Sequence, residues 1–148
     1  MNTKNCFIGQ SGGPTVAINA SLAGIITKCQ KEGFTHIYGM INGIQGLLED
    51  HFMDLGTIFN SEEKINALKH SPAMYLGSCR YKLPTVSDDK ATYDLLFKKF
   101  NDLEITDFFY IGGNDSMDTV AKLAAYGETI HSPIHFSGVP KTIDNDLR

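Results

Sequence analysis

Residues 106–127 read TDFFYIGGNDSMDTVAKLAAYG, which is an apolar run, a Gly-Gly turn and an amphipathic segment in direct succession. The apolar run is typical of an interior strand of a parallel sheet. The segment after the turn has the apolar spacing of a helix, and Gly127 is expected to end it. Because a strand that leads straight into a helix is half of a βαβ unit, this stretch predicts an α/β fold.

The same alternation continues on both sides of this stretch. We therefore expect a doubly wound, mostly parallel sheet with helices on both faces, in a single domain. Segment 41–50 is expected to be a loop, and the last strand is expected to be buried. Strands are predicted at 6–10, 34–40, 52–55, 73–80, 106–113 and 134–139, and helices at 16–33, 61–71, 87–103 and 116–127.

Two of the predicted helices begin with a recognisable cap. Ser61 precedes helix 61–71 and Ser87 precedes helix 87–103, and each serine is followed by two acidic residues. A serine side chain accepts hydrogen bonds from first-turn N–H groups, and negative charge in that turn suits the helix dipole. We expect both helices to begin at these serines.

Composition excludes several classes of protein. The chain has 148 residues, 42% of them hydrophobic and 20% charged, which suits one compact domain with a core. The net charge is −4 and no basic stripe occurs, so no nucleic-acid partner is expected. The apolar runs are far shorter than the ~20 residues that cross a bilayer, so no membrane partner is expected either.

The cysteines and histidines show no metal-binding spacing. The three cysteines, Cys6, Cys29 and Cys79, are widely separated and are expected to be reduced thiols. His131 and His135 are four residues apart, but Pro133 between them prevents the helix that would align them. With no signal-peptide pattern at the amino terminus, we expect a cytoplasmic protein.

Four predicted loops follow strands and are expected to open at one edge of the sheet, because parallel strands point their carboxyl ends the same way. Two of them contain Gly-Gly turns that lead into helices, where the backbone can approach a phosphate and the helix N-terminus can bind it. Neither turn matches the P-loop or the dinucleotide motif, and a turn without any ligand is the alternative. The loops are 9–15, 76–80, 111–118 and 140–146.

These loops combine cations with acids. Phosphoryl transfer needs bound phosphates, charge neutralisation and a base, which such a combination supplies. The alternatives are that Arg80 is a surface cation paired with an aspartate, and that segment 142–146 (TIDND) is an Asx turn with solvated carboxylates. The cations are Arg80 and Lys141, and the acids are Asp115, Asp118, Asp144 and Asp146.

Four segments resemble, in order, the motifs of the amino-terminal part of a phosphofructokinase. They are SGGPTVAINASL at 11–22, YLGSCR at 75–80, IGGNDSMDTVAKLA at 111–124 and GVPKTIDNDL at 138–147. The resemblance implies a doubly wound α/β fold. It also implies a glycolytic transferase that phosphorylates the 1-hydroxyl of fructose 6-phosphate to fructose 1,6-bisphosphate, with Mg²⁺ as cofactor.

The resemblance also implies roles for individual residues on the acceptor side. Asp144 would be the base that takes the proton from the sugar hydroxyl. Thr142 and Asp146 would hold the sugar phosphate end and the attacking hydroxyl in place. On the donor side, Gly12 and Gly13 would line the phosphoryl-donor site, and Arg80 would neutralise the transferring phosphate.

Two positions in this resemblance bear on the phosphoryl donor. ATP-dependent members resemble GGDGS and PGTIDND where this chain has GGNDS and PKTIDND. Asp115 would repel a nucleotide, and Lys141 would add a cation for pyrophosphate. Both features are shared with pyrophosphate-dependent members, so pyrophosphate is the implied donor. An ATP-dependent enzyme, or a catalytically silent phosphate-binding homologue, is the alternative.

Asn114 stands where many relatives have a metal-binding acid, and an amide is a weaker ligand for a hard cation. Asn114 and Asp115 are therefore both candidate Mg²⁺ ligands. The family's downstream half carries further sugar-phosphate contacts, some from a neighbouring subunit. We thus expect residues 1–148 to be the donor-side domain of a longer homo-oligomeric enzyme, inactive without the absent carboxyl-terminal half.

Overall fold

Five strands form a single sheet in the order β3-β2-β1-β4-β5. The structure, a computed structural model, describes residues 4–10, 15–71, 76–77 and 82–140, and for residues 15–17 and 115 it describes only the backbone. The strands are β1 (Asn5–Gln10), β2 (His36–Met40), β3 (Phe52–Asp54), β4 (Ile105–Gly112) and β5 (His135–Pro140).

Most of the strand pairing is parallel. β1 pairs in parallel with β2 and with β4, β4 pairs in parallel with β5, and only β3 is antiparallel, against β2. The connection from β2 to β3, residues 41–51, contains only the short helix α2 (Gly43–Leu48). The predicted mostly parallel sheet is confirmed.

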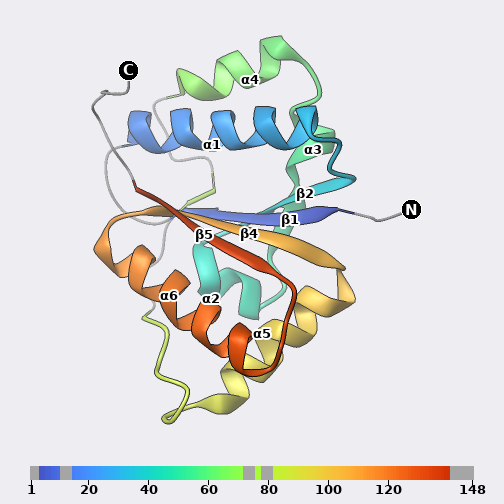
Figure 1. Cartoon of the computed structure of the whole chain (residues 1–148). Coiled ribbons are helices and arrows are strands. Elements are labelled where there is room, and N and C mark those ends of the chain that lie inside the picture. The colour runs from blue at the N-terminus through green and yellow to red at the C-terminus, as the bar shows by residue number, and fades with distance from the viewer. Residues whose placement is uncertain (1–3, 11–14, 72–75, 78–81, 141–148) are drawn as a thin grey trace.

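Helices cover both faces of this sheet. Figure 1 shows α1, α3 and α4 on one face and α2, α5 and α6 on the other. This arrangement confirms the doubly wound α/β fold. The helices are α1 (Thr15–Lys31), α2 (Gly43–Leu48), α3 (Leu55–Ile58), α4 (Glu62–Lys69), α5 (Lys90–Asp102) and α6 (Asn114–Thr129).

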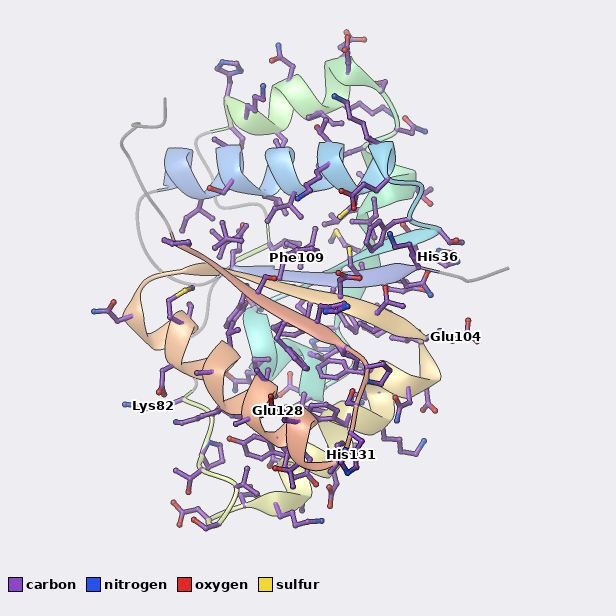
Figure 2. The ribbon with its side chains drawn as sticks, viewed as in Figure 1. His36, Lys82, Glu104, Phe109, Glu128 and His131 are labelled. Atoms are coloured by element: carbon purple, nitrogen blue, oxygen red, sulfur yellow. The ribbon has the colours of Figure 1, made fainter. Side chains whose placement is uncertain are left out.

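The core consists of two apolar layers separated by the sheet. Successive side chains of a strand point to opposite faces, so Ile8 joins the layer under α1 while Phe7 joins the layer over α5. The second layer is rich in rings, with the Phe100 and Phe108 centroids 5.6 Å apart. Figure 2 shows side chains filling the space between the sheet and both helix layers. No residue of β1 is exposed.

The predicted cap is confirmed for α4 and wrong for α5. The Ser61 hydroxyl oxygen accepts a hydrogen bond from the Lys64 backbone N–H at 3.2 Å. Before α5 the Thr85 carbonyl accepts the backbone N–H groups of Asp88 and Asp89, which forms a turn there. The helix therefore begins only after Asp89, whose carboxylate caps it by accepting the Thr92 N–H at 3.2 Å.

Segment 41–50 contains α2 and is not the predicted loop. Its two glycines suggested a loop, yet Gly46 lies inside the helix, and Ile44 and Leu47 are buried. A Cβ atom on Gly46 would lie 1.5 Å from the Ile41 carbonyl oxygen. Gly46 is therefore required by close packing, and it does not end a helix.

Gly127 does not end α6 either, because the helix continues to Thr129. A Cβ on Gly127 would lie 3.3 Å from the Phe136 ring and 3.5 Å from the Phe97 ring. The missing side chain leaves room for these two rings. The helix ends where His131 takes a left-handed φ of 59°.

The last strand forms as predicted, but it is not buried. β5 lies at the edge of the described sheet, and its residues are exposed or half-buried. Of the predicted strand 73–80, only Leu76 and Gly77 are described, and neither is in a strand. None of the helices in the described ranges is long and apolar enough to span a membrane.

Two of the cysteines agree with the predicted thiol state. Cys6 on β1 and Cys29 on α1 are buried and free, with their sulfur atoms 3.8 Å apart. The hydrogen bond with Cys29, together with burial, raises the pKa of the Cys6 thiol far above its ordinary value. Cys6 therefore stays protonated at neutral pH. Cys79 lies outside the described residues.

The packing around Gly9 gives a test of the sheet. A Cβ there would lie 2.4 Å from the Met40 methyl carbon and 2.5 Å from the Tyr110 ring. We expect Gly9→Ala to lower the free energy of unfolding by about 1–3 kcal/mol through overpacking. Gly24→Ala is the control. Gly24 lies inside α1, and a Cβ on it would meet nothing within 4 Å, so this substitution should raise stability by about 0.5–1 kcal/mol. Urea unfolding measures both, and equal effects would contradict this packing.

Candidate functional site at the carboxyl edge of the sheet

Three parallel strands end at the same edge of the sheet. Gln10, the last residue of β1, is in register with Ile111 of β4, and Gly112 of β4 is in register with Pro140 of β5. The chain therefore leaves β1, β4 and β5 at one edge, as predicted for the loops after them. His36 and Glu104 lie at the opposite, amino end of the strands (Figure 2).

The turn from β4 into α6 suits an anion. Gly113 is the N-cap residue and makes no side-chain cap hydrogen bond. A helix N-terminus carries partial positive charge, and without a capping side chain an outside acceptor such as phosphate can approach it. Asn114, the first residue of α6, is exposed at this position.

The end of β2 brings a fourth segment to this edge. The Asn42 backbone N–H donates to the Leu76 carbonyl at 2.8 Å, just beyond the last residue of β2. Gly77 follows with a left-handed φ of 72°, and a Cβ on it would lie 2.4 Å from the Asn42 side-chain oxygen. Leu76 and Gly77, the described part of the predicted loop 76–80, are thus attached next to the β2 carboxyl end.

Sequence reasoning missed a set of buried polar residues near this edge. Asn19 of α1 is fully buried, and its side-chain amide donates to the Ser71 carbonyl at 3.3 Å. Ser116 in the first turn of α6 is also buried. Gln10 is 0% exposed and, within the described chain, neither its side-chain nitrogen nor its oxygen has a hydrogen-bond partner. For Gln10 the available signal was a polar residue at the end of an apolar strand.

Most of the predicted site residues lie outside the described residues. Asn114 alone is described with its side chain, and for Asp115 only the backbone is placed, in the first turn of α6. The roles of all these residues stay predictions. Those outside the described ranges are Gly12, Gly13, Arg80, Lys141, Thr142, Asp144 and Asp146.

Asp118, another acid of the predicted loop 111–118, is described and pairs within its own helix, α6. Its carboxylate forms an ion pair with Lys122 one turn further along α6, at 2.9 Å. Among the residues that the structure covers, no group of three or more His, Cys, Asp or Glu side chains could hold a metal ion.

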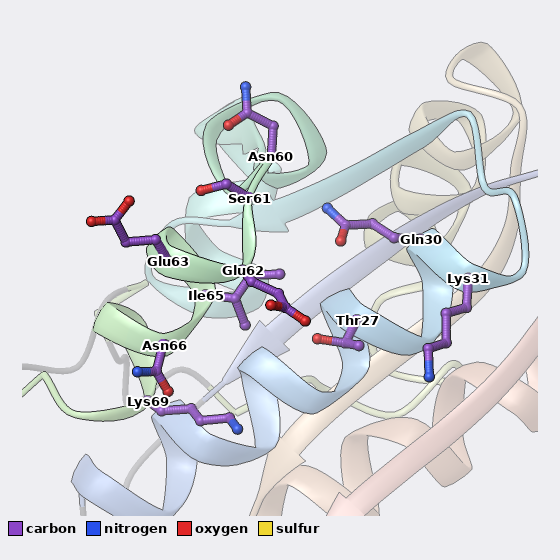
Figure 3. A pocket seen from close by; sticks show the side chains of 10 residues that line it. All are labelled: Thr27, Gln30, Lys31, Asn60, Ser61, Glu62, Glu63, Ile65, Asn66 and Lys69. Carbon is purple, nitrogen blue, oxygen red and sulfur yellow. The ribbon is translucent and has the colours of Figure 1, made fainter.

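A groove of about 840 Å³ lies elsewhere, between α1 and α4 (Figure 3). It uses the last turns of α1, whose first turn follows β1, so the groove is at the far end of that helix from the carboxyl edge. Most of the residues that line it have polar or charged side chains of both signs, with Lys31 and Lys69 beside Glu62 and Glu63. The groove and the predicted site are therefore separate.

Residues 5–148 match the family model described as Phosphofructokinase, and the chain belongs to this family. The pyrophosphate–fructose 6-phosphate 1-phosphotransferase of Halomonas elongata is 41% identical over 99% of this chain and 35% of its own length. An ATP-dependent 6-phosphofructokinase of Bacteroides thetaiotaomicron is more distant, at 29% identity over 93% of this chain and 38% of its own.

Solved structures agree with this relationship. The crystal structure of a pyrophosphate-dependent phosphofructokinase from Nitrosospira multiformis superposes with a TM-score of 0.84 and 41% identity, covering 96% of this chain and 34% of that one. The chain spans about a third of the length of the Halomonas and Nitrosospira relatives.

The contact between Gly77 and Asn42 can be tested by substitution. Gly77→Ala forces an alanine into a left-handed backbone conformation, which costs about 1–2 kcal/mol. The added Cβ also clashes with the Asn42 side chain. Gly33→Ala is the matched control, because its φ is 79° and nothing lies within 4 Å. We expect urea unfolding to give a larger stability loss for Gly77→Ala, by about 1 kcal/mol or more. Equal losses would show that the Asn42 contact is absent.

Proposed function

We propose that the full-length protein transfers a phosphoryl group from pyrophosphate to the 1-hydroxyl of fructose 6-phosphate. The products are fructose 1,6-bisphosphate and orthophosphate. The observation that carries this proposal is the 41% identity, over almost the whole chain, to a relative with that named activity. Support also comes from the three strands that end at one edge, which is where ligands of open α/β sheets bind.

In the proposed acceptor step, the Asp144 carboxylate removes the proton from the sugar 1-hydroxyl. The hydroxyl oxygen forms a bond to the nearer phosphorus of pyrophosphate as the bridging P–O bond breaks, and orthophosphate leaves. Thr142 and Asp146 hold the sugar phosphate end and the hydroxyl in line. Such positioning supplies much of the catalysis in phosphoryl transfer.

On the donor side, the backbone at Gly12 and Gly13 approaches the pyrophosphate, and Arg80 neutralises the transferring group. The first turn of α6 adds the partial positive charge of a helix N-terminus next to Asn114. Lys141 acts as a point charge on the terminal oxygens of pyrophosphate. The Asp115 carboxylate repels the α-phosphate of a nucleotide.

We also propose that Asn114 and Asp115 contribute to a Mg²⁺ site. The exposed Asn114 amide oxygen is a ligand that a hard cation accepts, although one amide is far from a complete set. Bound Mg²⁺ would neutralise phosphate charge.

We further propose that the full-length enzyme is a cytoplasmic homo-oligomer. Residues 1–148 form its donor-side part. A catalytically silent phosphate-binding homologue is the competing function. Asp144 and Arg80 favour the enzyme, because a silent subunit needs no base and no group for a transferring phosphate.

The proposed base is tested by Asp144→Asn in the full-length protein. Loss of a general base should lower kcat by ~10²-fold or more while substrate binding and folding stay largely intact. Steady-state kinetics and thermal melting measure these two properties. Asp102→Asn is the control, since Asp102 pairs with Lys98 on the exposed surface of α5. A near-normal kcat for Asp144→Asn would remove Asp144 from this role.

Donor choice is tested at two positions. We expect the wild-type enzyme to use pyrophosphate and not ATP, Asp115→Gly to give measurable ATP activity, and Lys141→Gly to raise KM for pyrophosphate. Asp115→Gly removes a like-charge repulsion against the nucleotide, and Lys141→Gly removes an attractive charge for pyrophosphate. The measurement is kcat/KM with each donor at fixed fructose 6-phosphate. A wild-type enzyme that uses ATP well and ignores pyrophosphate would overturn the assigned donor.

A further inference from the structure

Gln10 combines two properties that rarely occur together in a folded protein. Its side chain is 0% exposed, and within the described chain its amide nitrogen and amide oxygen both lack a hydrogen-bond partner. Buried polar side chains almost always find a partner, and an orphan one calls for a specific reason. The other buried amide near this edge, Asn19, does have a partner in the Ser71 carbonyl.

The face of the sheet to which the Gln10 side chain points carries an apolar layer. Gln10 follows Ile8 by two residues on β1, so its side chain points to the same face of the sheet, where Ile8 packs with Ile18 and Leu22 of α1. Its register partner Ile111 on β4 belongs to the same cluster. An apolar side chain at position 10 would continue this layer without leaving any polar atom unsatisfied.

The backbone of Gln10 has little freedom to relieve this situation. β1 is paired in parallel with β2 as far as Ile8 and with β4 as far as Gln10 itself, and none of its residues is exposed. Gly9, immediately before Gln10, packs against Met40 and Tyr110. The amide therefore cannot reach water by a small backbone shift. Any hydrogen-bond partner must be a group that approaches the buried amide.

The position of Gln10 indicates which partners these are. It is the last residue of β1, it is in register with the residue just before Gly112–Gly113, and the predicted donor-binding glycines Gly12 and Gly13 follow it in sequence. We propose that Gln10 is a positioning residue for pyrophosphate: its buried amide hydrogen-bonds the polar groups that surround the bound donor. This inference rests on the proposed function.

The test compares Gln10→Met with wild type in the full-length protein. Methionine has a similar length and shape but no amide, so removal of an unsatisfied polar group should leave the melting temperature unchanged or raise it. KM for pyrophosphate should rise about tenfold, the effect of losing hydrogen bonds made only in the bound state. KM for fructose 6-phosphate should change less than about twofold, because the amide serves the donor side.

A second measurement does not depend on turnover. Pyrophosphate should raise the melting temperature of the wild-type protein by binding to its folded state, and this shift should be much smaller in Gln10→Met. Gln30→Met is the matched control, since the Gln30 side chain donates to the Phe59 carbonyl at 2.8 Å, away from this edge. That control should lower the melting temperature and leave KM for pyrophosphate unchanged.

The outcomes for Gln10→Met and for the wild-type protein separate this inference from the proposed function. If Gln10→Met melts well below wild type or fails to fold, the amide is already bonded in the free protein and the inference is overturned. Unchanged KM and an unchanged pyrophosphate-induced shift in Gln10→Met also overturn it, while the proposed function stands. If wild type shows neither pyrophosphate activity nor a shift, it is the proposed function that fails.

Discussion

The burial of β1 on both faces, between two parallel neighbours, is the constraint on which the rest of the structure depends. Its side chains alternate between two apolar layers, so Ile8 requires α1 on one face and Phe7 requires α5 on the other. Pairing with β2 and β4 in the same direction aligns the carboxyl ends of all three strands. The predicted phosphate-binding edge is thus a consequence of how the centre of the core is packed.

Glycine adjusts the distances between these layers. A Cβ on Gly39 of β2 would lie 2.8 Å from Leu55 of α3, and one on Gly138 of β5 would lie 2.5 Å from the Met117 sulfur atom of α6. Close approach of helix and sheet at these points is possible because no side chain intervenes. The packing of α6 on β5 in turn orients the first turn of α6, where Asn114 and the helix N-terminus meet the edge.

The alternation of strands and helices was predictable from the sequence because it depends on local apolar spacing. The errors arose where one residue type serves two purposes. Gly46 suggested a loop and Gly127 a helix end, yet both are packing positions inside helices. The exposure of β5 depends on its place at the sheet edge, which no local pattern records. The burial of Gln10 results from tertiary packing, whereas the sequence places it where strand 6–10 and loop 9–15 overlap, a position at which a polar residue is usually exposed.

The charge of the chain makes the local geometry of the edge decisive. A net charge of −4 opposes a polyanion such as pyrophosphate, but salt at physiological strength screens charges beyond about 8 Å. Several charges of the described helices are also paired locally, as in Lys122 with Asp118 and Lys98 with Asp102. Attraction for a phosphate must therefore come from groups within a few ångströms: the α6 N-terminus, the glycine turns, and the predicted cations Arg80 and Lys141. The described strands bring the α6 N-terminus and the last residues of β1, β4 and β5 to that single edge, and the predicted cations belong to the proposed site there.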